Sequence, residues 1–407
     1  MQIALGHALL IITLLAAVAL HALWAARRQF PDNGPRQIGF CVIAAGILIA
    51  GSTVSLLASL LVPERVVYGD AVRYYYEILS IAEAPWLWNP LDGTGPYGYD
   101  KTPKMGMSYL YGVILGVYQA TGLPGVLALN IAALYVTAYS VFLLTLRISG
   151  SGTAAAVGMA IVGVYPETLF WVIRPARENI TLPLVTLAAY GGIRLFDTGR
   201  ARWLAGLAVI TVALLLTRAQ LVLFVGIVFT YYGVVVAGRV FFRGSLSGAG
   251  IVAISLIAAA AAIPYATDQI RAAAGNAVIH VIVSLDPIGM LAELGEGGGG
   301  DGIRLLPSGY GAAGLLMLPL VAGTVALAAG TLFRFTRIFR GAVVPAGMVL
   351  VMVGAFLAML TLLGGVSLRF RSAIAPLLIA LLAPGAVYYW RVLALPSIAL
   401  PTKRVAA

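Results

Sequence analysis

Cysteine, histidine and charged residues are scarce in this chain of 407 residues. It has one cysteine, Cys41, and three histidines that lie far apart in the sequence. A single cysteine cannot form an intramolecular disulfide or a thiolate metal site, and so few soft ligands argue against structural zinc. Charged residues make up 10% of the chain, whereas soluble domains carry about 25%. The composition therefore excludes a soluble globular protein.

Apolar residues dominate instead, at 61% of the chain with a mean hydropathy of +0.98, which predicts an integral membrane protein. Acidic residues number 15 against 26 basic ones, giving a formal net charge of +11. No basic cluster stands on a soluble domain, so we expect membrane lipids as partners and no nucleic acid. The first apolar run has neither a positive n-region nor a cleavage site and is expected to remain as a spanning helix.

Apolar runs long enough to cross about 30 Å of hydrocarbon predict an all-α polytopic protein with about eleven transmembrane helices. The expected spans are residues 3–25, 38–62, 123–146, 152–170, 181–196, 202–217, 220–238, 247–265, 312–333, 341–364 and 372–390.

The basic residues predict the orientation, because cytoplasmic loops carry an excess of Lys and Arg. The residues expected on the cytoplasmic side are Arg27, Arg28, Arg36, Arg147, Arg194, Arg200, Arg202, Arg239, Arg243, Arg334, Arg337, Arg340, Arg391, Lys403 and Arg404. Only Asp32 and Asp197 among the acidic residues share that side, so the chemistry is expected on the extracytoplasmic side. This orientation requires residues 107–122 to form an interfacial or re-entrant helix rather than a span.

The expected organisation has five parts. Residues 1–62 form two transmembrane helices, 63–122 a first extracytoplasmic loop with interfacial helices, and 123–265 the central transmembrane helices. Residues 266–311 form a second extracytoplasmic loop, and 312–407 form the C-terminal transmembrane helices and a cytoplasmic tail. Loops this long in a membrane protein are usually functional or disordered.

The segment GDAVRYYYEI places Asp70 at the boundary between water and membrane, directly after a long apolar helix. A carboxylate there can act as a general base on a polar substrate, and general-base catalysis raises the rate on the order of 10²- to 10⁴-fold. Asp70 is equally well placed to cap a helix from Ala71 to about Ala84, and the two roles are compatible. Glu77 lies two turns along the same face, where it is either a second ligand for a metal or acceptor or a solvated or paired residue.

A turn between two spans, within residues 165–183, carries Arg174, Arg177, Glu167 and Glu178. Arginines three apart can face one phosphate, which guanidinium groups bind well. Dense charge at a membrane turn is costly unless it is paired, so internal pairing with the two glutamates is the alternative.

Arg369 and Arg371 precede the last span on the extracytoplasmic side, against the general charge trend. An anionic partner explains them, either the phosphate of a lipid substrate or ordinary headgroups reached by snorkelling. Arg218 is a weaker candidate of the same kind. His280 is expected to pack in an amphipathic loop helix, with a catalytic role as the alternative.

Four segments occur in an order that resembles the GT-C membrane glycosyltransferases, particularly the protein-mannosyltransferase and aminoarabinose-transferase type. They are GDAVRYYYEI, KTPKMGMSY, RPAREN and RFRSAIAP. The resemblance implies transfer of a sugar from a polyprenyl-phosphate donor to a lipid-linked or cell-surface glycan acceptor, at the extracytoplasmic face of the bacterial inner membrane. The chain departs from the family in an additional first helix and in Arg177–Glu178, where many relatives have an aspartate.

For Asp70 the resemblance implies the role of general base, or of a metal-bound carboxylate in members that use a divalent metal. Residues for the donor phosphate would be Arg174, Arg177, Arg369 and Arg371. Further candidates for substrate binding are Tyr74, Glu77, Lys101, Lys104, Glu178, Arg218 and His280. Two alternatives remain: a polysaccharide polymerase or O-antigen ligase with a lipid pyrophosphate donor, and a flippase or transporter for lipid-linked sugars, which would favour charges at mid-membrane.

Overall fold

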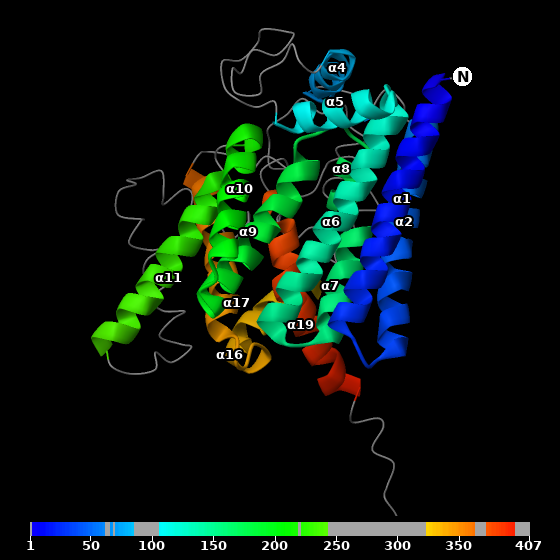
Figure 1. The fold of residues 1–407 in the computed structure, drawn as a ribbon. Helices are drawn as coiled ribbons and strands as arrows, with labels where there is room; N and C mark the ends of the chain where they lie inside the picture. The colour runs from blue at the N-terminus through cyan, green and yellow to red at the C-terminus, as the bar shows by residue number, and fades with distance from the viewer. Residues whose placement is uncertain are drawn as a thin grey trace, which may run out of the picture.

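A computed structural model describes residues 2–61, 66–67, 70–84, 106–218, 221–242, 323–362 and 372–394. This part of the chain consists of helices joined by turns, and contains no β-strand (Figure 1). The helices are α1 (Gln2–Gln29), α2 (Gly34–Leu61), α4 (Asp70–Glu83), α5 (Gly106–Tyr118), α6 (Leu123–Ser149), α7 (Gly152–Val164), α8 (Pro166–Val172), α9 (Glu178–Thr198), α10 (Ala201–Arg218), α11 (Val222–Phe242), α16 (Phe335–Ile338), α17 (Val343–Leu362), η4 (Ser372–Ile374) and α19 (Ala375–Ala394).

Several of these helices are long and apolar enough to cross a membrane, which makes the chain an all-α multi-pass membrane protein. Six helices in the described ranges meet that criterion, namely α1, α2, α6, α9, α10 and α19. Helices α7, α11 and α17 are apolar over shorter stretches. The expected count of eleven spans is therefore not confirmed, and the expected span at residues 247–265 lies outside the described part.

The span expected at residues 152–170 is broken into two helices, which corrects the sequence-based boundary. Helix α7 ends at Val164 and α8 begins at Pro166. Proline has no backbone N–H and suits the first position of a helix, where that donor is not needed. The Thr168 hydroxyl donates to the carbonyl oxygens of Val162 and Tyr165, which satisfies acceptors at the break.

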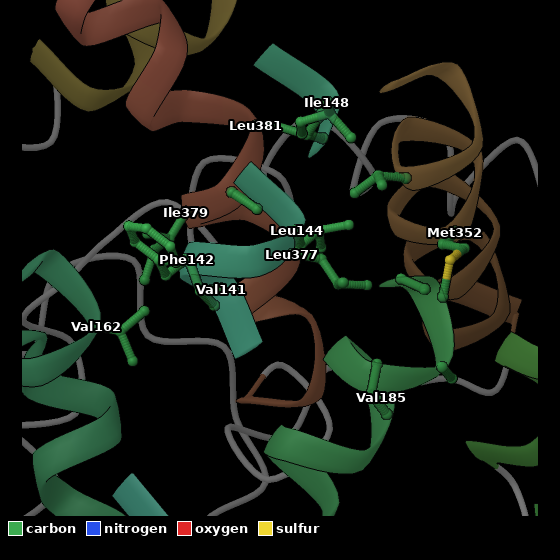
Figure 2. Close-up of a cluster of buried hydrophobic side chains, with 14 of the residues drawn as sticks. Val141, Phe142, Leu144, Ile148, Val162, Val185, Met352, Leu377, Ile379 and Leu381 are labelled. Carbon is green, nitrogen blue, oxygen red and sulfur yellow. The ribbon is translucent and has the colours of Figure 1, made fainter. Parts of the chain in front are cut away.

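The core lies where α6 meets α7, α9, α17 and α19 (Figure 2). Helix α6 contributes Phe142 and Leu144, which are fully buried, and α19 contributes Leu377 from the other side. The apolar stretch of α6 is 67% buried inside the protein, whereas those of α1 and α10 are each 22% buried. Helix α6 is therefore the central helix of the bundle, while α1 and α10 leave apolar faces uncovered, as expected beside lipid.

Contacts between distant segments define two ends of the bundle. At one end, Phe30 in the α1–α2 turn packs on Phe142 of α6, and Arg147 pairs with Asp197 at the end of α9. We call this the basic end. The basic residues described there are Arg27, Arg28, Arg36, Arg147, Arg194, Arg200, Arg202, Arg334, Arg337, Arg340 and Arg391, with α16 and the end of α19 on the same side (Figure 1). Among described acidic residues, only Asp32 and Asp197 lie at this end.

The opposite end, which we call the α4 end, carries the two short helices α4 and α5. Helix α5 lies across the long axes of α1 and α6 (Figure 1). Its 13 residues span about 20 Å, which is too short for this helix alone to cross the hydrocarbon. The interfacial placement of residues 107–122 stays a prediction. Gly112 and Gly116 of α5 allow α4 to approach closely, because a Cβ at either position would collide with α4.

Candidate functional site

Helix α4 begins at Asp70, one residue before the start expected with Asp70 as its cap, and the capping role stays a prediction. The expected helix ran from Ala71 to about Ala84, and the observed one runs from Asp70 to Glu83. It buries one face, including Tyr74, against α5 and α6. The position of Asp70 is four residues, hence about 6 Å along the helix axis, from that of Tyr74, and the two positions share a helix face. The side chain of Asp70 lies outside the description.

Glu77 connects α4 to α5. Its side chain is 1% exposed, and it accepts hydrogen bonds from Nε of Arg73 at 2.7 Å and from Oγ of Ser108 at 3.0 Å. Burying a carboxylate costs free energy unless charge and hydrogen bonds compensate it, and here both do. Of the interpretations offered for Glu77, the structure supports the paired residue. Within the described ranges, no three His, Cys, Asp or Glu side chains gather as a metal site.

Burial also affects a tyrosine beside this face of α4. It raises the pKa of Tyr75 above its ordinary value of 10.0; the nearby Tyr76 adds to the rise, and a hydrogen bond with the backbone of Leu123 opposes it. The phenol of Tyr75 is therefore neutral at physiological pH.

Two amide side chains hold the turn between α8 and α9 in place. Nδ2 of Asn130, fully buried in α6, donates to the carbonyl oxygens of Val172 at 2.9 Å and Arg174 at 2.8 Å. Nδ2 of Asn179 donates to the carbonyl oxygens of Trp171 at 3.0 Å, Arg174 at 2.9 Å and Ala176 at 3.2 Å. These bonds satisfy carbonyl groups that leave the helical pattern at the turn. The turn is thus tied directly to the central helix.

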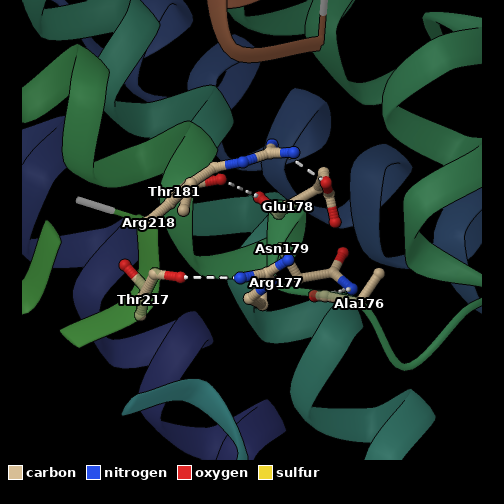
Figure 3. Close-up of polar contacts among 7 residues, drawn as sticks. All are labelled: Ala176, Arg177, Glu178, Asn179, Thr181, Thr217 and Arg218. Carbon is tan, nitrogen blue, oxygen red and sulfur yellow. Dashed lines mark hydrogen bonds and ion pairs between the residues drawn. The ribbon is translucent and has the colours of Figure 1, made fainter. Parts of the chain in front are cut away.

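Two consecutive residues at the start of α9 bind two consecutive residues at the end of α10 (Figure 3). Nη1 of Arg218 donates to Oε1 of Glu178 at 3.0 Å, with both side chains almost fully buried, at 5% and 1% exposure. Nη1 of Arg177 donates to the carbonyl oxygen of Thr217 at 3.3 Å. The negative charge of Glu178 also lies in the first turn of α9, where the helix dipole stabilises it.

Arg177 differs from Arg218, because Arg177 has no carboxylate partner among the described residues. Its Nε is buried without an acceptor in the same part of the chain. Its guanidinium carbon lies 5.1 Å from the centre of the Tyr74 ring, so the positive charge faces the aromatic face of α4. Arg177 is therefore a cation at the α4 end with donor capacity left for an anion.

The sequence left phosphate binding and internal pairing open for the charges of this turn. Glu178 pairs with Arg218, the arginine judged a weak candidate, rather than with its neighbour Arg177. The guanidinium of Arg174 lies over the Phe170 ring at 4.8 Å. Glu178 is therefore paired with an arginine from outside the turn, and phosphate binding by Arg174 and Arg177 stays a prediction.

The fold brings Tyr74, Arg177, Glu178 and Arg218 together at the α4 end. The remaining candidates, Lys101, Lys104, His280, Arg369 and Arg371, lie outside the described residues. Element η4, which follows Arg371 directly in the sequence, packs against α9.

Sequence reasoning missed Asn130 and Asn179 as supports of the turn. Asn130 offered a signal, because it is a lone amide within an apolar span, where polar side chains usually have a specific partner. Asn179 offered none beyond its place next to the charged turn.

Comparison with known proteins places no further constraint on the site: no protein-family model matches the chain, and no curated protein matches it.

Proposed function

We propose that this chain is a membrane glycosyltransferase of the GT-C type. It transfers a sugar from a polyprenyl-phosphate donor to a lipid-linked or cell-surface glycan acceptor, at the extracytoplasmic face of the bacterial inner membrane. The observation that carries the proposal is the contact between Arg177 and Tyr74, because it joins a cation with no carboxylate partner in the described ranges to the helix that begins at Asp70.

The charges suit the two ends of the transfer reaction. Asp70 takes the proton of an acceptor hydroxyl, whose oxygen forms a bond to the anomeric carbon of the sugar. The bond between that carbon and the phosphate oxygen breaks, and the phosphate leaves with the electron pair. Arg177 neutralises the charge that develops on this phosphate, and electrostatic help of this kind is usually the largest single contribution to catalysis. Arg174, Arg369 and Arg371 are the other proposed phosphate ligands.

The distribution of charge supports an extracytoplasmic site. The basic end matches the cytoplasmic side under the positive-inside rule, so the α4 end faces the other side of the membrane. Polyprenyl-linked sugars are lipids, and an interfacial site reached from the bilayer admits the polar head while the tail stays among the helices. The paired arrangement of Glu178 and Arg218 would support the donor site rather than act on the substrate.

The full chain, reconstituted in vesicles, tests the proposal with polyprenyl-monophosphate-linked hexoses and pentoses as donors and a lipid-linked glycan extract as acceptor. We expect sugar transfer with release of polyprenyl phosphate. Asp70→Asn is expected to lower the rate by about 10²- to 10⁴-fold with donor binding retained. Arg177→Gln is expected to raise KM for the donor.

The control is Asp32→Asn, which changes an exposed acid in the turn at the basic end and is expected to leave transfer unchanged. A folded Asp70→Asn variant with the full rate would rule out Asp70 as the base. Transfer from a pyrophosphate donor alone would favour the polymerase or ligase. Movement of labelled lipid-linked sugar between leaflets without transfer would favour the flippase.

A further inference from the structure

The turn between the helix Gly323–Phe333 and α17 presents arginine side chains outward at the basic end. Helix α16 lies in this turn. It is held to the protein by Phe335 and Phe339, which are both buried and whose ring centres lie 4.7 Å apart. The backbone N–H of Phe339 also donates to the carbonyl oxygen of Phe335 at 2.9 Å. The arginines of the turn are all exposed, namely Arg334, Arg337 and Arg340.

The end of α19 lies beside this turn. The hydroxyl of Tyr389 donates to the carbonyl oxygen of Gly330 at 2.6 Å, and α16 lies against α19. An aromatic side chain is strongly exposed on each of the two helix ends, Phe333 at 83% and Trp390 at 75%. Arg391, next to Trp390, adds a fourth exposed cation. We call these residues the α16 surface: Phe333, Arg334, Arg337, Arg340, Trp390 and Arg391.

The positive charge of the α16 surface is not balanced within the described part of the chain. None of its arginines forms an ion pair with a described residue. The two acids described at the basic end lie elsewhere, because Asp197 is bound by Arg147 of α6 and Asp32 lies in the α1–α2 turn. The guanidinium carbon of Arg334 lies 5.3 Å from the centre of the Phe333 ring. Guanidinium groups offer donors only, so the complementary partner is anionic.

The exposed aromatic side chains indicate that this partner is a membrane surface. Helix α19 is long and apolar enough to span a membrane, and Arg391 lies in its last turn, next to Trp390. A spanning helix leaves the hydrocarbon for the headgroup layer at such a point. Tryptophan is enriched at that depth, and arginines beside it reach lipid phosphates. Basic groups combined with exposed aromatic side chains are typical of surfaces that bind anionic lipids.

We propose that the α16 surface binds the anionic lipid headgroups of the leaflet at the basic end. Its arginines contact lipid phosphates, and Phe333 and Trp390 enter the headgroup layer beside them. Every side chain that the proposal uses is exposed, so lipid reaches it without a change in packing. The proposal is independent of the glycosyltransferase function, because this surface lies at the opposite end of the bundle from Arg177 (Figure 1).

Thermal unfolding of the purified full chain in neutral detergent tests the proposal, with phosphatidylglycerol as the anionic probe and phosphatidylcholine as the neutral one. A ligand that binds only the folded state raises Tm as its concentration increases. We expect phosphatidylglycerol to raise Tm of the wild type more than phosphatidylcholine does. The difference should shrink as salt is added, because exposed charges are screened. Arg334→Gln combined with Arg337→Gln and Arg340→Gln should lower the apparent affinity for phosphatidylglycerol by about 100-fold, since each arginine near an anionic surface contributes about fivefold.

The matched control removes the same charge at the same end of the bundle. It is Arg27→Gln combined with Arg28→Gln and Arg36→Gln, in and beside the turn that also carries Asp32. We expect this control to keep most of the response to phosphatidylglycerol. Equal losses of affinity in the two triple variants would overturn the proposal, because they would show a general attraction to all basic residues at this end. An unchanged response in the first triple variant would overturn it too.

A variant of the aromatic side chains keeps the test decisive if the first triple variant does not fold. Phe333→Ser combined with Trp390→Ser leaves every charge in place, and both side chains are exposed. This variant should keep the Tm of the wild type in detergent alone and bind phosphatidylglycerol several-fold more weakly. Wild-type affinity in this variant would rule out entry of the two side chains into the headgroup layer. A Tm shift of the same size with inorganic phosphate would overturn the proposal in favour of a free anion.

Discussion

Replacement of Arg218 by glutamine removes the partner of Glu178, whose side chain is 1% exposed. The carboxylate then stays buried but loses the positive charge that Arg218 supplies at 3.0 Å. Loss of one member of a buried ion pair typically costs about 3–5 kcal/mol of folding free energy. The bond between Arg177 and the carbonyl of Thr217 does not replace this charge, because it already exists in the wild type.

The ion pair between Arg147 and Asp197 is the control, because it has the same chemistry but is more exposed to solvent. Its two side chains are 32% and 24% exposed, and its N–O distance is 2.6 Å. Solvent screening reduces such a pair to about 0–1 kcal/mol. Arg147→Gln is therefore expected to cost less than a third of what Arg218→Gln costs. The difference between the two losses of unfolding free energy reports the effect of burial, because each variant removes one guanidinium group from one carboxylate.

The measurement is reversible unfolding in mixed detergent micelles, for the wild type, both single variants and Glu178→Gln combined with Arg218→Gln. Removal of both charges should recover most of the loss, since replacing a buried pair by neutral groups is often tolerated. Equal losses of unfolding free energy in Arg218→Gln and in Arg147→Gln would refute the role of burial. A double variant as unstable as Arg218→Gln would refute the account based on charge.

The same variants report on the proposed donor site. In Arg218→Gln, the negative charge of Glu178 is no longer offset by Arg218 and repels a donor phosphate bound at Arg177, the preceding residue in the chain. We therefore expect KM for the donor to rise in the single variant and to return toward the wild-type value in the double variant. An unchanged KM in the single variant would separate the ion pair from donor binding.

Two further predictions concern the packing at the α4 end. Gly112→Ala would bring a Cβ within 2.6 Å of the Ile81 side chain and 2.9 Å of a backbone oxygen of α4. This variant should lose about 1–3 kcal/mol of unfolding free energy in the same assay. Gly226→Ala is the control, because the space around Gly226 is open, and it should be neutral or stabilising. An equal effect at both positions would contradict the close approach of α4 and α5. Asn130→Leu removes the donors to the carbonyl oxygens of Val172 and Arg174 and should lower the free energy of unfolding by about 2–3 kcal/mol. Asn130→Asp retains acceptors only and should lower it by at least as much. Wild-type stability in Asn130→Leu would show that the turn does not depend on its bonds to α6.

The local pattern predicted some elements well. Asp70 followed by an amphipathic run predicted α4 nearly to the residue, because a capping side chain and a helical apolar face are both local signals. The break at Pro166 was missed, since hydropathy alone treats residues 152–170 as one span. The proline was visible in the sequence, and its preference for the first turn of a helix is the signal that would have placed the boundary.

The amino-acid sequence by itself indicated a helical membrane protein with most of its basic residues on one side, because hydropathy and charge distribution act through the solvent and need no knowledge of neighbours. Only the tertiary structure decided which charges are compensated. Glu178 and Arg218 are 40 residues apart, and their pairing depends on how α9 packs against α10. That packing assigns Arg218 to Glu178 and leaves Arg177 beside Tyr74, on the helix that begins at Asp70.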